Sequence, residues 1–124
     1  MEKIALFLLI VLFPIISNAN EQYRTPRTGD YGDYYIIESE VVNNGLIRVL
    51  CSRIGKGRAY TDFTEILVDC SSQKYLGIAE RYEDGAKEKP TKSLKKYKTK
   101  SKWASLVTGS SKYDLVQYIC KKYR

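Results

Sequence analysis

The sequence predicts an α+β fold, in which a disulfide ties one C-terminal α-helix across a single antiparallel β-sheet of about five to six strands. Three observations support it. Between positions 34 and 82, apolar and polar residues alternate in stretches that turn residues separate, as in antiparallel strands. Residues 115–123 instead place apolar side chains three and four positions apart, as on one face of a helix. The chain also has three cysteines, and its N-terminal residues indicate export to an oxidising compartment.

The first nineteen residues have the layout of a secretory signal peptide. Lys3 gives a positive start, residues 4–16 are apolar and interrupted by Pro14, and small residues up to Ala19 form a cleavage site. This apolar run of about 13 residues is shorter than the roughly 20 of a membrane span, which disfavours the alternative of a membrane anchor. We expect export to the periplasm, the outer-membrane surface or the extracellular space, with no transmembrane segment after cleavage.

The remaining residues suffice for one domain. Residues 20–32 are polar and contain Pro26, Gly29 and Gly32, so we interpret them as a flexible leader. The folded domain is expected over residues 33–124.

Four strands are expected first, at residues 34–42, 46–54, 60–70 and 74–82. Asn43, Asn44 and Gly45 tolerate a positive φ, which predicts a tight hairpin turn between the first two strands. Residues 83–85 predict another turn after the fourth strand.

Residues 87–102, here called the lysine segment, carry eight lysines and one acid, Glu88. Pro90 interrupts regular structure early in the segment. Lysine then occupies alternate positions, which predicts an exposed loop that leads into a short strand with an outer face of Lys98, Lys100 and Lys102.

One helix is expected at the C-terminal end of the chain. Ser110 or Ser111 can cap its start, and Asp114 resembles the acid of a capping box. Lysines in its last turn suit the helix dipole. The predicted buried face consists of Leu115, Val116, Ile119, Cys120 and Tyr123.

The residues favour a disulfide between Cys70 and Cys120. Cys70 shares an inward strand face with Ile66 and Val68, and Cys120 lies on the buried face of the helix. A bridge that closes a loop of about 50 residues contributes roughly 4 kcal/mol in the chain-entropy model. The alternative is a bridge between Cys51 and Cys70 across neighbouring strands. In the favoured arrangement Cys51 packs as a small apolar side chain.

The composition argues against catalysis and against a cofactor. The chain has no histidine, which removes histidine bases and histidine metal ligands. The cysteine spacing does not resemble a zinc site, and the carboxylates form no recognisable pair. We therefore expect a protein that is not an enzyme, with no catalytic residue, metal or other cofactor. Its net charge of +7 favours anionic partners, and it has no motif for specific binding of nucleic acid.

Four stretches follow one another in a recognisable order: a first hairpin over residues 34–49, the cysteine strand and hairpin over residues 68–85, residues 103–110, and the terminal helix over residues 115–120. This pattern resembles the surface-adhesin protein E family of bacterial secreted and outer-membrane proteins. Its most specific part is the order and spacing of Cys70, Trp103 and Cys120. The resemblance implies an antiparallel sheet crossed by a C-terminal helix with a Cys70–Cys120 bridge. Through the best-known member of that family, it also implies binding of host matrix and serum proteins.

Two hypotheses of function follow. The first is an exported binding protein that engages host matrix or serum proteins, or another anionic polymer, through the lysine segment and nearby aromatic rings. The second is a periplasmic inhibitor or immunity-type protein that binds a toxin or an enzyme. Either protein could form a homodimer. The binding residues predicted by the first hypothesis are Lys87, Lys89, Lys92, Lys95, Lys96, Tyr97, Lys98, Lys100, Lys102 and Trp103.

A purely structural role for the lysines is the alternative to binding. Charged side chains on an exposed edge strand prevent that strand from pairing with another chain. Lys98, Lys100 and Lys102 would serve this purpose if they lay on such a strand.

Overall fold

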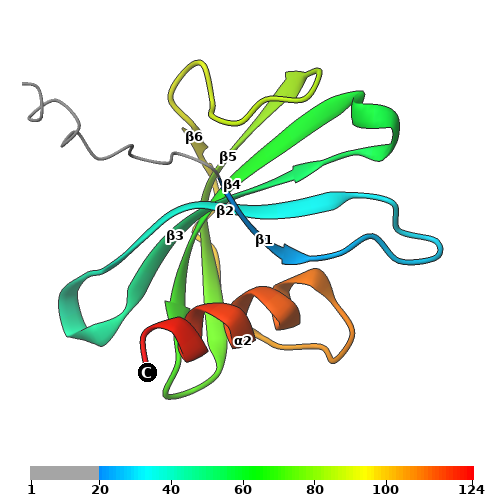
Figure 1. Ribbon diagram of the computed structural model, residues 1–124. Helices are drawn as coiled ribbons and strands as arrows, with labels where there is room; N and C mark the ends of the chain where they lie inside the picture. Colours follow the sequence, from blue (N-terminus) through cyan, green and yellow to red (C-terminus); the bar gives the residue numbers. More distant parts are fainter. Residues whose placement is uncertain (1–19) are drawn as a thin grey trace, which may run out of the picture.

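The computed structural model describes residues 20–124, which form one antiparallel sheet with an α-helix across it (Figure 1). The strand order is β1-β2-β3-β4-β5-β6, and β7 also pairs with β5. The predicted fold class is therefore confirmed, whereas the expected signal peptide, residues 1–19, lies outside the described residues. The elements are β1 (Glu21–Arg24), β2 (Asp33–Val41), β3 (Ile47–Ile54), β4 (Tyr60–Asp69), β5 (Lys74–Asp84), β6 (Lys95–Lys96), β7 (Ala104–Ser105) and α2 (Ser111–Lys122).

The β2–β3 hairpin forms where the turn residues predict it. Val41 pairs with Ile47, and the turn between them contains Asn44 at φ 63° and Gly45 at φ 74°. Asparagine and glycine are the residues that adopt this left-handed conformation most readily, so the turn has the residues that its backbone requires.

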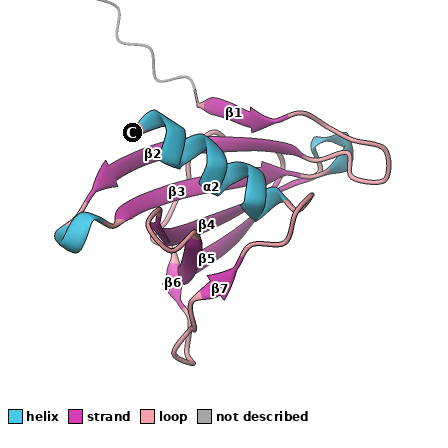
Figure 2. Ribbon diagram, turned by 90° about the horizontal axis from the view of Figure 1, so that it is seen from below, coloured by secondary structure: helices cyan, strands magenta, loops and turns pink. Residues whose placement is uncertain are grey.

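The main core lies between the sheet and the helix. β3 and β4 each direct alternate apolar side chains toward α2, and the inner face of the helix meets them. Figure 2 shows α2 lying across β2 and β3. The buried residues of this core are Ile36, Ile47, Val49, Cys51, Ile66, Val68, Leu115, Val116 and Ile119.

The opposite face of the sheet is also covered in part. Phe63 is fully buried although it lies on the other side of β4 from Ile66. Thr61, on the same side as Phe63, donates to the carbonyl of Gly85 at 2.8 Å and accepts from the backbone N–H of Lys87 at 2.9 Å. The chain after β5 therefore packs against this second face.

The helix begins as predicted. Ser110 is the N-cap residue, and its hydroxyl accepts from the backbone N–H of Tyr113 at 3.2 Å. Asp114 lies in the first turn, where its carboxylate accepts from Arg24 at 3.2 Å and from Arg27 at 2.8 Å. The carboxylate thus links the helix to the N-terminal residues of the domain.

The favoured disulfide is present. Cys70 follows β4, Cys120 lies on α2, and their Sγ atoms are bonded with the Cα atoms 5.6 Å apart. The alternative Cys51–Cys70 bridge is wrong, because Cys51 is a buried free thiol. Burial raises the pKa of Cys51 to about 11, which keeps it in the unreactive thiol form near neutral pH.

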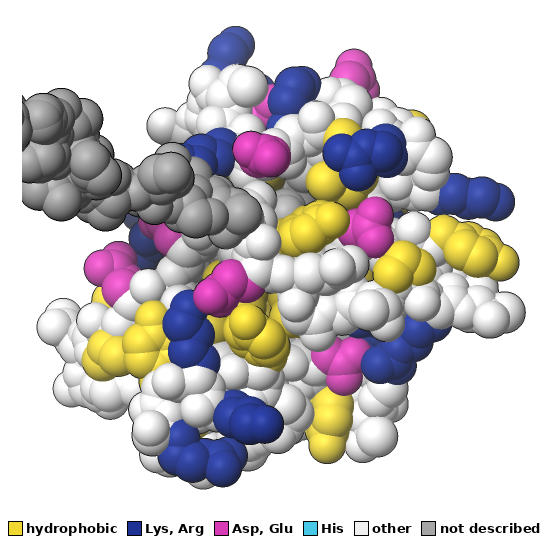
Figure 3. Space-filling view, viewed as in Figure 1, with side chains coloured by type: hydrophobic (Ala, Val, Ile, Leu, Met, Phe, Trp, Pro, Cys, Tyr) yellow, Lys and Arg dark blue, Asp and Glu magenta, His cyan; other side chains and the backbone are white. Residues whose placement is uncertain are grey.

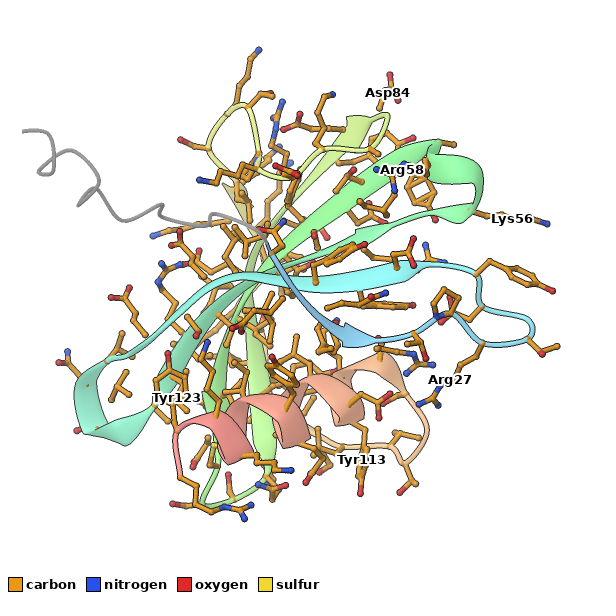
Figure 4. All side chains as sticks on the ribbon, viewed as in Figure 1. Arg27, Lys56, Arg58, Asp84, Tyr113 and Tyr123 are labelled. Carbon is orange, nitrogen blue, oxygen red and sulfur yellow. A yellow bond between two sulfur atoms is a disulfide. The ribbon has the colours of Figure 1, made fainter. Side chains whose placement is uncertain are left out.

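Residues 20–32 do not form the flexible leader that we expected. β1 pairs with β2 through Glu21–Ile36 and Arg24–Tyr34, and Arg24 is buried. The guanidinium of Arg24 is held by Asp114 and by the carbonyl of Gly109 at 3.3 Å. Figure 4 shows Arg27 close to the N-terminal end of α2. Ion pairs with α2 therefore hold residues 20–32 in place. The polar composition of these residues could not indicate those pairs, because the partner residues lie far along the chain.

The prediction of a strand at the end of the lysine segment is also wrong. Lys98, Lys100 and Lys102 lie in the irregular chain between β6 and β7, and the segment contributes two residues to the sheet, Lys95 and Lys96. Within residues 20–124, no helix is both long and apolar enough to cross a membrane.

Candidate functional site

The lysine segment runs along the outer edge of β5. Lys96 pairs with Ala79 and Lys95 with Glu80, and the backbone N–H of Tyr97 donates to the carbonyl of Ile78 at 3.2 Å. These backbone contacts fix the middle of the segment to the sheet. Seven of its eight lysines are exposed, and Lys87 is half-buried.

A buried carboxylate anchors the start of the segment. Glu83, which is 6% exposed, accepts from the backbone N–H of Thr91 at 2.8 Å, from the Thr91 hydroxyl at 3.0 Å and from Nε of Arg81 at 2.6 Å. Lys87 Nζ lies 3.8 Å from the same carboxylate. The hydrogen bonds from Thr91 and Arg81, that of the Thr91 N–H first among them, lower the pKa of Glu83 to about 2.

Tyr97 fixes the other part of the segment. Its hydroxyl lies 3.2 Å from Oε1 of Glu80, and its ring lies over Gly77 so closely that an added Cβ would stand 3.1 Å from Cε2. Burial, together with the charge of Glu80, raises the pKa of Tyr97. The tyrosine therefore stays protonated and can donate to Glu80.

Between the segment and the sheet lies a cavity of about 680 Å³, here called the lysine pocket. Four basic, two acidic and three aromatic residues line it, together with one threonine. The aromatic rings include those of Tyr82, which is 59% exposed, and Tyr97, which is 38% exposed. The lining residues are Asp62, Phe63, Thr64, Glu80, Arg81, Tyr82, Lys95, Lys96, Tyr97 and Lys98.

The structure brings some of the predicted binding residues together and separates others. Lys95, Lys96, Tyr97 and Lys98 line the lysine pocket. The others lie outside that lining: Lys87, Lys89 and Lys92 in the chain before β6, and Lys100, Lys102 and Trp103 in the chain before β7.

Asp62, Arg81 and Tyr82 line the pocket but are not among the predicted binding residues. Asp62 pairs with Tyr82 across β4 and β5, so the two side chains lie on one face of the sheet. The polar residues at alternate positions of these two strands were the available signal. These residues form a pocket only because β6 pairs with β5, and the sequence does not indicate that pairing.

Four carboxylates of β4 and β5, at Glu65, Asp69, Glu80 and Glu83, each have a separate structural contact. Glu65 accepts from Arg48 at 3.0 Å, and Asp69 accepts from the backbone N–H of Ser71 at 3.0 Å in the turn before β5. Glu80 and Glu83 hold Tyr97 and Thr91. Over residues 20–124, no group of three or more side chains of the metal-binding types is gathered at one place.

Comparisons of the chain with known protein families, with curated proteins and with solved structures find no match. A function for this chain has to be inferred from its own residues.

Proposed function

We propose that this protein is an exported binding protein that engages an anionic partner, such as a host matrix or serum protein, through the lysine segment. The observation that carries the proposal is the state of the lysine charges. Among the described residues, Lys87 is the one lysine of the segment that has an ion-pair partner. The other seven project into solvent without a carboxylate within 4.0 Å in residues 20–124.

Such a set of charges creates a strong local field. Lysine ammonium groups act as compact point charges, and several of them on one short segment attract an anionic surface before contact. On the face shown in Figure 3, which includes part of the segment, basic, acidic and hydrophobic side chains are interspersed. The absence of carboxylate partners in the described part of the chain, more than a uniformly basic face, is what favours an anionic partner for the segment.

Aromatic side chains in the segment and directly after it can add contact area. Tyr97 and Trp103 are 38% and 40% exposed. Partly exposed aromatic rings with a polar atom are frequent in protein interfaces, because they bury a large area and still form a hydrogen bond.

Edge protection does not account for the position of Lys98, Lys100 and Lys102. That alternative requires Lys98, Lys100 and Lys102 on an exposed edge strand, but they lie between β6 and β7. The edge of β5 is itself paired with both of these short strands.

The resemblance to the surface-adhesin protein E family agrees with this proposal. A C-terminal helix tied across an antiparallel sheet by Cys70 and Cys120 is the arrangement that the resemblance implies. We propose membership of that family, with export to the cell envelope or beyond, as the context in which the binding takes place.

The test is retention of acidic proteins by the oxidised mature protein at low and high salt. The variant Lys95→Ala/Lys96→Ala/Lys98→Ala/Lys100→Ala should weaken binding by roughly 2 kcal/mol, or about thirtyfold, if each exposed contact contributes about 0.5 kcal/mol. Binding by the unmodified protein should be lost as salt rises to about 0.5 M.

The matched control removes four positive charges elsewhere, at Lys56, Arg58, Lys74 and Lys121. Lys56 and Arg58 lie in the turn between β3 and β4 (Figure 4), outside the lining of the lysine pocket. This control should bind as tightly as the unmodified protein, apart from the general effect of net charge. An equal loss of binding affinity in both variants would show that net charge alone drives binding, and it would contradict the proposal.

A second candidate, a periplasmic inhibitor or immunity-type protein, is favoured by exposed tyrosines outside the segment. Tyr31 is 52% exposed beside Lys56, and Tyr82 stacks near Tyr60 with ring centroids 5.5 Å apart. Aromatic anchors of this kind support salt-tolerant, stoichiometric complexes. This candidate would be supported by a complex isolated from periplasm that persists in about 0.5 M salt and that the four-lysine variant still forms.

A further inference from the structure

A second, smaller cavity lies beside the lysine pocket, on the side of the sheet that α2 covers. It has a volume of about 160 Å³ and is here called the helix pocket. Cys51 lies in its lining, and Ser111 and Lys112 contribute from the first turn of α2. Asp62 and Thr64 line both this pocket and the lysine pocket, so the two cavities meet over β4.

The strand register places the lining residues in order. Cys51 on β3 pairs with Thr64 on β4, Thr64 with Glu80 on β5, and Glu80 with Lys95 on β6. Residues paired directly across strands share one face of a sheet, so this row crosses four strands on the helix side. Three strand spacings of roughly 4.8 Å make the row about 14 Å long.

Lys112, in the first turn of α2, lines the helix pocket. Its side chain is half-buried, and its Nζ lies 6.0 Å from the ring centroid of Tyr75. In residues 20–124 no carboxylate lies within 4.0 Å of this ammonium group. A half-buried cation without a counter-ion raises the affinity of the helix pocket for an anionic group.

Charges of both signs line the two pockets. Lys112 and Arg53 line the helix pocket, Asp62 lies in the wall that both pockets share, and Glu80, Lys95 and Lys98 line the lysine pocket. A molecule with continuous negative charge would bring that charge against Asp62 and Glu80 and be repelled there. A molecule with anionic groups separated by hydroxyl groups would instead donate hydrogen bonds to these carboxylates.

We propose that the two pockets form one groove for an acidic oligosaccharide in which carboxylate-bearing sugars alternate with neutral sugars. Lys112 and Lys95 would each bind a sugar carboxylate, while Glu80 and Asp62 accept from hydroxyl groups between them. Tyr82 and Tyr97 supply flat apolar surface for the sugar rings. This inference rests on the proposed function, because it names the ligand class of the same lysine segment.

Short hyaluronan fragments are a suitable probe, since they alternate a uronate with a neutral amino sugar. Calorimetry of the oxidised protein should detect their binding near physiological salt. Lys112→Met, which keeps the length of the side chain, should weaken hyaluronan binding about tenfold. Lys121→Met, on the same helix but outside both pockets, should leave it unchanged. Polyglutamate and polyphosphate of similar total charge should bind more weakly than hyaluronan.

A second variant covers the case in which Lys112→Met does not fold. Thr64→Val removes a hydroxyl from the shared wall with little change in volume and should also lower hyaluronan affinity. The inference is overturned if hyaluronan does not bind, if both groove variants bind it normally, or if polyglutamate binds equally well. Loss of acidic-protein binding in the four-lysine variant would leave the proposed function intact in each of these cases. Unchanged binding of every anion by the four-lysine variant would overturn both.

Discussion

At the scale of single residues, Glu83 determines how the lysine segment leaves the sheet. Its carboxylate accepts hydrogen bonds from Thr91 and from Arg81 and also lies near Lys87. All three contacts favour the ionised form, because a protonated acid would lose part of its acceptor capacity and its charge. The pKa of about 2 reflects this preference for the carboxylate.

The lowered pKa predicts how stability depends on pH. In the unfolded chain Glu83 has an ordinary pKa near 4.5, so its contribution is present above about pH 4.5 and is lost as pH falls toward 2. Glu83→Gln should therefore be less stable than the unmodified protein at neutral pH, and the difference should narrow below about pH 4.5. Urea unfolding followed by circular dichroism across this range measures it. Glu88→Gln, at an exposed side chain, is the control, and a gap independent of pH would contradict the prediction.

At the scale of elements, the sequence predicts the long strands and the helix because each has a period of its own. β2 to β5 and α2 lie within one or two residues of their expected positions, and Leu115, Val116 and Ile119 are buried as periodicity indicates. The expectation that Tyr123 is buried is wrong, because this residue follows the last turn of α2 and is 37% exposed. β1, β6 and β7 have four residues or fewer, which is too short for a periodic pattern. Their pairing depends on partners far along the chain, such as Lys96 with Ala79.

The bridge between β4 and α2 predicts a large change in stability. Cys70→Ser/Cys120→Ser should lower the free energy of unfolding by roughly 4 kcal/mol, because the unfolded chain regains the freedom of a loop of about 50 residues. The apolar contacts of Leu115, Val116 and Ile119 should still hold the helix in place at low temperature.

Urea unfolding of both proteins measures this loss. Cys51→Ala is the matched control, since it removes a buried sulfur and leaves the bridge; it should cost about 1 kcal/mol. A double variant no less stable than this control would show that the bridge contributes little.

At the scale of the whole molecule, the candidate groove is formed by residues from every part of the domain. Cys51, Thr64, Glu80, Lys95 and Lys112 are far apart in the sequence and meet only through the strand register and the position of α2. Composition indicated the lysine segment, because charge density is a local property. Lys112, Asp62 and Glu80 could not be assigned to the same site from the sequence. Their proximity to the lysine segment depends on the pairing of β6, a strand of two residues that has no recognisable pattern.

The same arrangement predicts how the folded protein is cleaved by trypsin. The bonds after Lys98, Lys100 and Lys102 lie in exposed chain outside the strands, whereas Arg48 on β3 is engaged by Glu65 and its backbone is paired on both sides. Because Cys70 precedes and Cys120 follows these bonds, the disulfide spans the cleavage sites. Trypsin at low concentration should therefore give a nicked protein that migrates as one species without reductant and as two with it.

The four-lysine variant, which keeps Lys102, should be cut more slowly in this region. First cleavage at Arg48 or Arg53 would contradict the arrangement, since those bonds become accessible only when the β2–β3–β4 strands separate.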